Sequence, residues 1–102
     1  MKYRLSKAFE KSLLQLSGKE LQSALDMLEK VESKERIEDI PDCIKLKSFN
    51  NVYRIKLGSR RAFFTFHVEI IENVLFFRYL INRGQAYDKA MEQKLRQIDE
   101  SQ

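Results

Sequence analysis

The sequence has few of the residues that build disulfides or metal sites. Its 102 residues include one cysteine, Cys43, one histidine, His67, and no tryptophan. A single cysteine excludes an intramolecular disulfide and any zinc site built from several thiolates, and one histidine cannot complete another ligand set. We therefore expect no metal and no small-molecule cofactor. This cysteine usage also suits a reducing compartment, which predicts a cytoplasmic protein.

Glycine, proline and long apolar runs are scarce as well. The chain has three glycines and one proline, with 43% hydrophobic and 33% charged residues, which argues against a disordered or low-complexity protein. The first twenty residues lack the apolar stretch of a signal peptide, and no segment approaches the roughly 20 apolar residues that span a bilayer. We expect a single domain over residues 1–102, without membrane contact.

Acidic residues are missing from one part of the chain. Residues 43–87 hold 8 basic and 2 acidic side chains, whereas residues 1–42 hold 8 and 9. Between Cys43 and Val68 there is no carboxylate, but there are six basic residues: Lys45, Lys47, Arg54, Lys56, Arg60 and Arg61. We expect these cations to bind an external anion, or to form ion pairs with carboxylates from elsewhere in the fold or from a partner.

The N-terminal part shows helical periodicity after a short strand. Residues 3–5 fit a first strand, and Ser6 fits the N-cap of a helix that buries Phe9. Ser17 and Glu20 have the spacing of a capping box, which predicts that each side chain accepts a hydrogen bond from the other's backbone N–H. The second helix then has an apolar stripe of Leu21, Ala24, Leu25, Leu28 and Val31.

From residue 44 the apolar period changes from helical to two. Apolar residues alternate with basic ones at residues 44–47 and again, after a turn at 50–51, at residues 53–57. Reversals at 58–59 and 72–73 then lead into two further apolar segments, and we predict three successive antiparallel strands. A final helix, beginning at Tyr87, has one apolar face and a polar end at residues 99–102 that we expect to fray.

Together these segments predict a small α+β domain of order β-α-α-β-β-β-α. In this fold a twisted antiparallel sheet carries two N-terminal helices packed on one face, and a C-terminal helix follows. If Ile55 and Leu57 face the helices, alternation places Arg54 and Lys56 on the opposite face, which is at least partly open. By the same alternation Arg61 shares a face with Phe63 and His67, and Arg78 shares one with Val74 and Phe76.

The segment PDCIKLKSFNNVYRIKLGSRRAFF, followed by a hydrophobic strand and then NRGQAY, resembles the RelE/ParE superfamily of bacterial toxin–antitoxin modules. The resemblance runs from the first strand to about Tyr87, includes the order of elements, and favours the RelE-like branch. It implies metal-independent cleavage of mRNA, typically on the ribosome. The catalytic residues that it implies are Arg54, Lys56, Arg61, Arg83 and Tyr87. The sequence differs from the family in its C-terminal motif: some relatives have a carboxylate or His there, where this chain has Asn82 before Arg83, and Gly84 replaces a residue that is frequently basic.

The implied chemistry explains why these residue types are needed. Attack of a ribose 2′-oxygen on the adjacent phosphate builds negative charge, which fixed guanidinium and ammonium groups stabilise. A base must take the 2′ proton and an acid must protonate the 5′-oxygen, and Tyr87, His67 and Lys56 are the candidates. The resemblance favours Tyr87. As RNA-binding candidates we add the other basic residues near these strands: Lys45, Lys47, Arg60, His67 and Arg78.

Less specific interpretations stand beside this one. Basic residues on a strand usually form a solvated sheet face, His67 can be a structural histidine, and the phenylalanines can be core, with one or two left to stack a base. The resemblance implies a toxin that inhibits translation and is neutralised by a cognate antitoxin with an acidic, amphipathic segment. The alternatives are a ParE-like inhibitor of DNA gyrase without RNase activity, and an inactive relative that binds RNA or protein.

Overall fold

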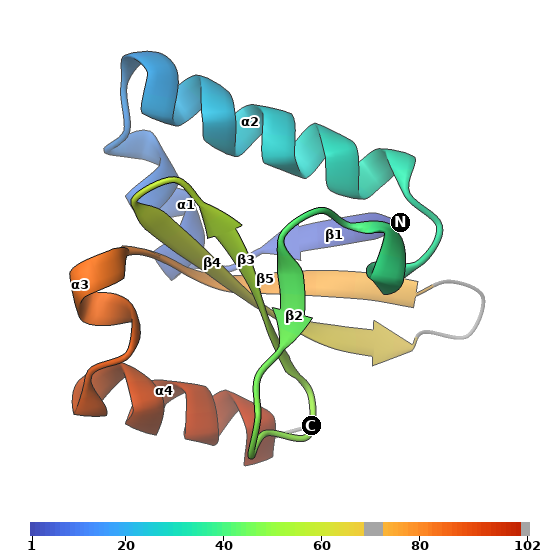
Figure 1. Ribbon diagram of the computed structural model, residues 1–102, viewed down its shortest axis with the longest axis vertical. Helices are drawn as coiled ribbons and strands as arrows, with labels where there is room; N and C mark the ends of the chain where they lie inside the picture. The colour runs from blue at the N-terminus through green and yellow to red at the C-terminus, as the bar shows by residue number, and fades with distance from the viewer. Residues whose placement is uncertain (69–72, 101–102) are drawn as a thin grey trace.

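A five-stranded sheet lies between two groups of helices (Figure 1). The computed structural model describes residues 1–68 and 73–100. The strands are β1 (Lys2–Leu5), β2 (Cys43–Lys45), β3 (Val52–Leu57), β4 (Arg60–Val68) and β5 (Asn73–Asn82). The helices are α1 (Lys7–Leu14), α2 (Gly18–Ser33), the 3₁₀ turn η1 (Ile37–Asp39), α3 (Arg83–Ala86) and α4 (Lys89–Glu100). Helices α1 and α2 cover one face of the sheet, and α3 and α4 lie against the other (Figure 1).

The strand order is β1-β5-β4-β3-β2, and the sheet is mixed. Strands β2 to β5 pair antiparallel, as predicted, but β1 runs parallel to β5, so the prediction of a fully antiparallel sheet is wrong. The chain between β1 and β5 is long enough for parallel neighbours, which a tight hairpin cannot join. The predicted number of strands after the helix pair is also one too few, because the short alternating run around Ile44 forms β2.

The two predicted helix starts have different outcomes. Ser6 caps α1 as predicted, since its Oγ accepts a hydrogen bond from the Phe9 N–H at 3.0 Å. Ser17 precedes α2, but its side chain makes no capping hydrogen bond, so the predicted capping box is wrong. The carboxylate of Glu20 instead accepts a hydrogen bond from Nε of Arg60 at 2.8 Å. A charged donor is a stronger partner for a carboxylate than a backbone N–H.

Most of the core lies between the sheet and the α1–α2 pair. Phe9 of α1, Phe64 of β4 and Phe77 of β5 are fully buried there, with centroids of adjacent rings 5.2–5.3 Å apart. The apolar stripe of α2 is confirmed except at Leu25, which is 44% exposed. A second, smaller cluster on the other face holds α3 and α4 in place; its buried members are Val52, Phe63, Ala86, Met91 and Leu95. Within the described residues no helix is both long and apolar enough to span a bilayer.

A β-bulge interrupts the pairing of β4 with β5. Phe63 pairs with Tyr79, whereas Phe64 pairs with Phe77, so Arg78 is the extra residue. Alternation along β5 therefore shifts at this point. The guanidinium of Arg78 lies 3.9 Å from the centroid of the Phe76 ring, on the face that the sequence predicts.

The C-terminal region differs from the prediction of one helix with a frayed end. Tyr87 follows the short helix α3, and α4 begins only at Lys89. Asp99 near the end of α4 is 7% exposed, and its carboxylate accepts hydrogen bonds from the backbone N–H groups of Asn50 and Asn51 at 2.7–3.1 Å. These long-range hydrogen bonds hold α4 against the β2–β3 loop. The reversal predicted at Glu72 and the last two residues of the chain lie outside the described residues.

Replacing Asp99 with Ala is expected to lower the free energy of unfolding by about 1–3 kcal/mol, because two backbone N–H groups lose their acceptor. Urea denaturation followed by circular dichroism measures the change. Glu100→Ala, at the exposed neighbouring position, is the matched control and should change stability by no more than about 0.5 kcal/mol. Equal stability of the two variants would show that the Asp99 contact contributes nothing.

Candidate active site

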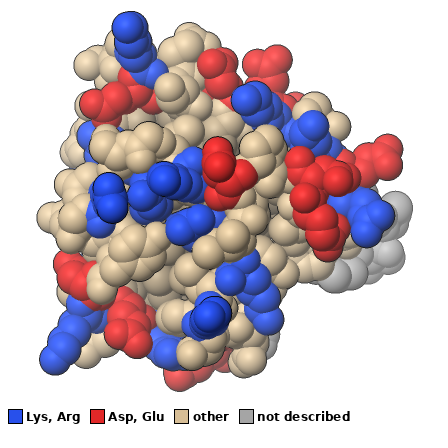
Figure 2. All heavy atoms as spheres, viewed as in Figure 1, with Lys and Arg blue, Asp and Glu red and all other residues tan. Residues whose placement is uncertain are grey.

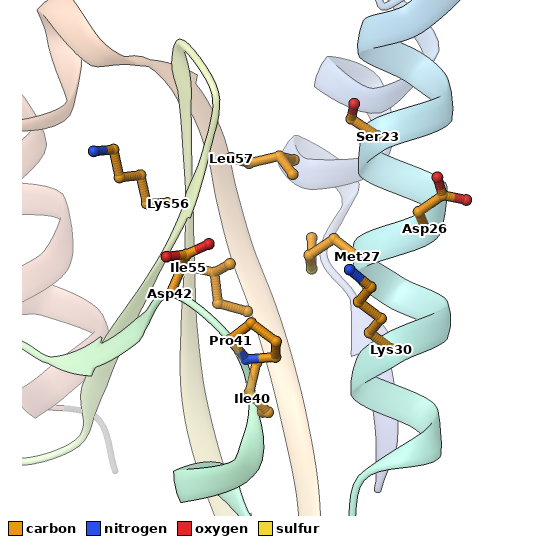
Figure 3. A pocket seen from close by; sticks show the side chains of 10 residues that line it. All are labelled: Ser23, Asp26, Met27, Lys30, Ile40, Pro41, Asp42, Ile55, Lys56 and Leu57. Atoms are coloured by element: carbon orange, nitrogen blue, oxygen red, sulfur yellow. The ribbon is translucent and has the colours of Figure 1, made fainter.

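Three of the predicted catalytic cations lie together on the sheet face opposite α2. Ile55 and Leu57 point toward α2, whereas Lys56 points to the other side of β3 (Figure 3). The pairing of β3 with β4 places Lys56 beside Arg61, and Arg54 beside Phe63. Residues paired in this way share a face of the sheet, so the predicted position of Arg54 and Lys56 opposite the helices is confirmed, and the pairing adds Arg61 to the same face.

Arg61 is almost completely buried, at 4% exposed. Its Nη1 donates hydrogen bonds to the carbonyl oxygens of Gly58 and Arg60, both at 2.8 Å, which fix the guanidinium under the β3–β4 turn. The Nε atoms of Arg61 and Arg54 are buried and have no hydrogen-bond partner. Buried donors without an acceptor cost free energy, so the fold holds these two guanidinium groups at a cost in stability.

Carboxylates do not neutralise this site. Within residues 1–68 and 73–100 no ion pair joins Arg54, Lys56 or Arg61 to an aspartate or glutamate. Lys and Arg side chains gather in a band across the middle of the molecule, at the level of the β3–β4 hairpin (Figure 2). The local field therefore favours a negatively charged ligand.

Tyr87 contributes a hydroxyl group to the same site. Nη1 of Arg54 donates a hydrogen bond to the Tyr87 hydroxyl oxygen at 3.2 Å, and the Tyr87 ring meets Phe63 edge-on at 6.5 Å. Partial burial raises the pKa of Tyr87, but hydrogen bonds and positive charge from Arg54 and Arg61 lower it, and the net shift is downward. The tyrosine is 58% exposed, so its oxygen remains accessible.

Arg83 lies at the same corner of the molecule. Its backbone N–H donates to the carbonyl of Ser59 in the β3–β4 turn at 2.7 Å, and its side chain is exposed. Asn82 caps α3 by accepting a hydrogen bond from the Gln85 N–H at 3.2 Å. The sequence analysis missed this cap, although Asn82 and Gln85 have the spacing that signals one. At Gly84 an added Cβ would lie 3.5 Å from Oδ1 of Asn82, an ordinary contact, so the fold does not require glycine there.

Three of the RNA-binding candidates lie outside this site. Lys45 is exposed on β2 and pairs with Tyr53, whose ring packs on the α2 side of the sheet. Lys47 is exposed in the loop after β2. Arg60 pairs with Glu20 of α2, so a carboxylate within the chain already meets its charge.

His67 and Arg78 form a separate polar group farther along the sheet. Nε2 of His67 lies 2.9 Å from Oγ1 of Thr65, and Nε of Arg78 lies 3.5 Å from the same oxygen. His67 is six residues from Arg61 along β4, which corresponds to about 20 Å of extended chain. The structure therefore does not bring His67 to the candidate active site.

A cavity of about 220 Å³ lies on the opposite side of the sheet, between α2 and β3 (Figure 3). Met27, Ile40 and Ile55 form apolar walls, and Asp26 and Lys30 bring opposite charges to it. Its mixed charge makes it a poor anion site. No three His, Cys, Asp or Glu side chains come together as metal ligands would in the part of the chain that the structure describes.

The chain matches no protein-family model and no curated protein in sequence. It is similar in structure to an archaeal RelE–RelB complex from Pyrococcus horikoshii OT3, with a TM-score of 0.64, 24% identity, and coverage of 83% of this chain and 97% of that chain. The RelB–RelE antitoxin–toxin complex of Methanococcus jannaschii also gives 0.64 and 24%, covering 82% and 94%. The E. coli toxin RelE, a double arginine-to-alanine mutant in the free state, gives 0.67 and 19%, covering 95% of each chain. These similarities show the fold.

Replacing Arg54 with Gln is expected to raise the pKa of Tyr87, because the substitution removes a hydrogen bond and a positive charge that favour the phenolate. A pH titration of tyrosine absorbance measures the shift. The difference between the curves of the wild type and Tyr87→Phe identifies the titration of Tyr87. Arg36→Gln removes an equal charge from an exposed arginine that pairs with Glu38, and should leave the curve unchanged. Superimposable curves for wild type and Arg54→Gln would refute the proposed coupling.

Proposed function

The chain has the RelE fold, and from this fold and the cluster of Arg54, Arg61 and Tyr87 we propose that it is the toxin of a toxin–antitoxin pair and cleaves mRNA. One observation carries the proposal: two guanidinium groups with unpartnered, buried Nε atoms adjoin a tyrosine whose hydroxyl oxygen accepts a hydrogen bond from one of them. Such a site fits a phosphodiester, because guanidinium groups bind phosphate oxygens through their planar array of donors.

In the proposed reaction the ribose 2′-oxygen attacks the adjacent phosphorus. The bond from phosphorus to the 5′-oxygen breaks, which leaves a 2′,3′-cyclic phosphate and a 5′-hydroxyl. Negative charge grows on the phosphate oxygens in the transition state. In this proposal Arg54 and Arg61, which are held by hydrogen bonds, and the neighbouring Lys56 stabilise that charge.

We assign the proton transfers to Tyr87 and Lys56. The lowered pKa of Tyr87 increases its phenolate fraction, so its oxygen is the proposed base for the 2′-hydroxyl proton. Lys56, which pairs with Arg61, is the proposed donor to the departing 5′-oxygen. His67 is less suitable as either group because it lies about 20 Å along β4 from Arg61. Arg83 is the proposed contact to the flanking phosphate.

The proposed substrate is ribosome-bound mRNA in the cytoplasm, and the proposed partner is a cognate antitoxin. An acidic, amphipathic segment of that antitoxin would supply the carboxylates that Arg54, Lys56 and Arg61 lack within the described chain. Charge attraction of this kind weakens as salt is added. An affinity for a glutamate-rich amphipathic peptide that stays the same from low to high salt would contradict this role of charge.

Induction of the wild type in bacteria is expected to arrest growth and to create new RNA 5′ ends within translated messages. Tyr87→Phe and Arg54→Gln should each reduce cutting by about 10²–10⁴-fold. Tyr87→Phe removes the proposed base, and Arg54→Gln removes a cation that also donates a hydrogen bond to the Tyr87 hydroxyl. Sequencing of RNA 5′ ends measures the cuts.

Matched controls are Tyr3→Phe, on β1 at the other side of the sheet, and Arg36→Gln, and both should cut as the wild type does. Growth arrest without cuts would favour a gyrase-directed toxin. Neither arrest nor cuts would indicate an inactive relative that binds RNA or protein.

A further inference from the structure

A second group of cations lies on the same sheet face as Arg61, around the partly exposed Phe76 of β5. The parallel pairing of β1 with β5 places Arg4 beside Phe76, and the pairing of β4 with β5 places Thr65 on the other side of Phe76. The next row across the sheet contains Lys2, Val74 and His67. Paired residues share a face, so basic side chains flank the Phe76 ring. The sequence analysis did not include Lys2 or Arg4.

Arg78 is the central cation of this group. The bulge in β5 turns it onto the face of Phe76, where its guanidinium lies 3.9 Å from the ring centroid. Its Nε also donates a long hydrogen bond to Thr65 Oγ1 at 3.5 Å. No carboxylate in that part of the chain pairs with Arg78, and its Nη groups remain available as a fork of donors.

Helix α4 separates this group from the candidate active site. Met91 and Leu95 of α4 pack with Phe63, which lies between Arg61 and Thr65 on β4. Arg61 and Thr65 are four residues apart, or about 13 Å along the strand. A ligand on Phe76 and Arg78 is therefore distinct from one at Arg61 and Tyr87.

We propose that Arg4, His67, Phe76 and Arg78 form a second RNA-binding site, which holds a separate RNA segment from the one that is cut. Its ligand is the phosphodiester backbone, bound by the guanidinium group of Arg78, with a base placed against the Phe76 ring and the Arg78 guanidinium plane. The inference rests on the proposed function, because it takes RNA as the ligand of the chain. Its role is to hold a large RNA so that the message reaches Arg61.

Binding of a fluorescent RNA hairpin to the Tyr87→Phe protein, followed by anisotropy at several salt concentrations, tests the proposal. This parent keeps all its cations and is not expected to cut the probe. Adding Arg78→Gln should weaken binding about tenfold and reduce the slope of log affinity against log salt by about 0.7–0.9, the value for one lost phosphate contact. Lys30→Gln, which removes one charge near the cavity on the α2 side, should change neither quantity.

Arg78→Lys separates loss of charge from loss of fold. Lysine keeps the charge but not the planar fork, so this variant should retain the salt slope and recover part of the affinity.

The remaining outcomes distinguish this inference from the proposed function. If the wild type cuts RNA but Arg78→Gln binds the hairpin as tightly as its parent does, the second site is wrong and the proposed function stands. If the wild type makes no cuts but Arg78→Gln still weakens hairpin binding, the proposed function is wrong and the second site stands.

Discussion

The buried guanidinium of Arg61 determines the arrangement of the candidate active site. The carbonyl oxygens of Gly58 and Arg60 hold it under the β3–β4 turn, and Gly58 adopts a φ of 59° that other residues adopt only with strain. The same hairpin places Lys56 directly across from Arg61. Like charges that face each other on paired strands destabilise a sheet, so the fold retains a repulsion that a bound anion relieves.

The unequal covering of the sheet explains why this site is accessible. The α1–α2 pair buries one face on a core of several phenylalanines, whereas α4 covers only part of the other through Met91 and Leu95. The β2–β3 loop holds the end of α4, because Asp99 accepts hydrogen bonds from the backbone of that loop and Arg96 donates one to the Ser48 carbonyl. Helix α4 therefore lies between Arg61 and Phe76 on this face of the sheet.

Local patterns in the sequence predicted much of this arrangement. Alternation placed Arg54 and Lys56 on one face of their strand, because the side-chain period of a strand is fixed by its backbone. It grouped Arg61 with Phe63 and His67 on the next strand, and the β3–β4 register, which joins the two groups, came only from the structure. Contacts between distant residues were not predictable. The hydrogen bonds from the loop to Asp99, the parallel pairing of β1 with β5, and the competition of Arg60 for Glu20 all depend on tertiary structure. Periodicity and capping rules consider only neighbouring residues, so they predicted a frayed end and a capping box.

The structure shows which of the cations between Cys43 and Val68 are affected by the lack of carboxylates in that segment. Of the six cations in that segment, Arg60 is neutralised by Glu20, and Lys45 lies on the α2 side of the sheet. Arg54, Lys56 and Arg61 have no ion pair with a carboxylate in the described chain. The Nε atoms of Arg54 and Arg61 also have no hydrogen-bond partner. Buried donors and unpaired charge reduce stability, and such costs are typical of binding sites. A candidate site in a basic protein is therefore better defined by cations that the fold leaves unpaired than by the number of cations.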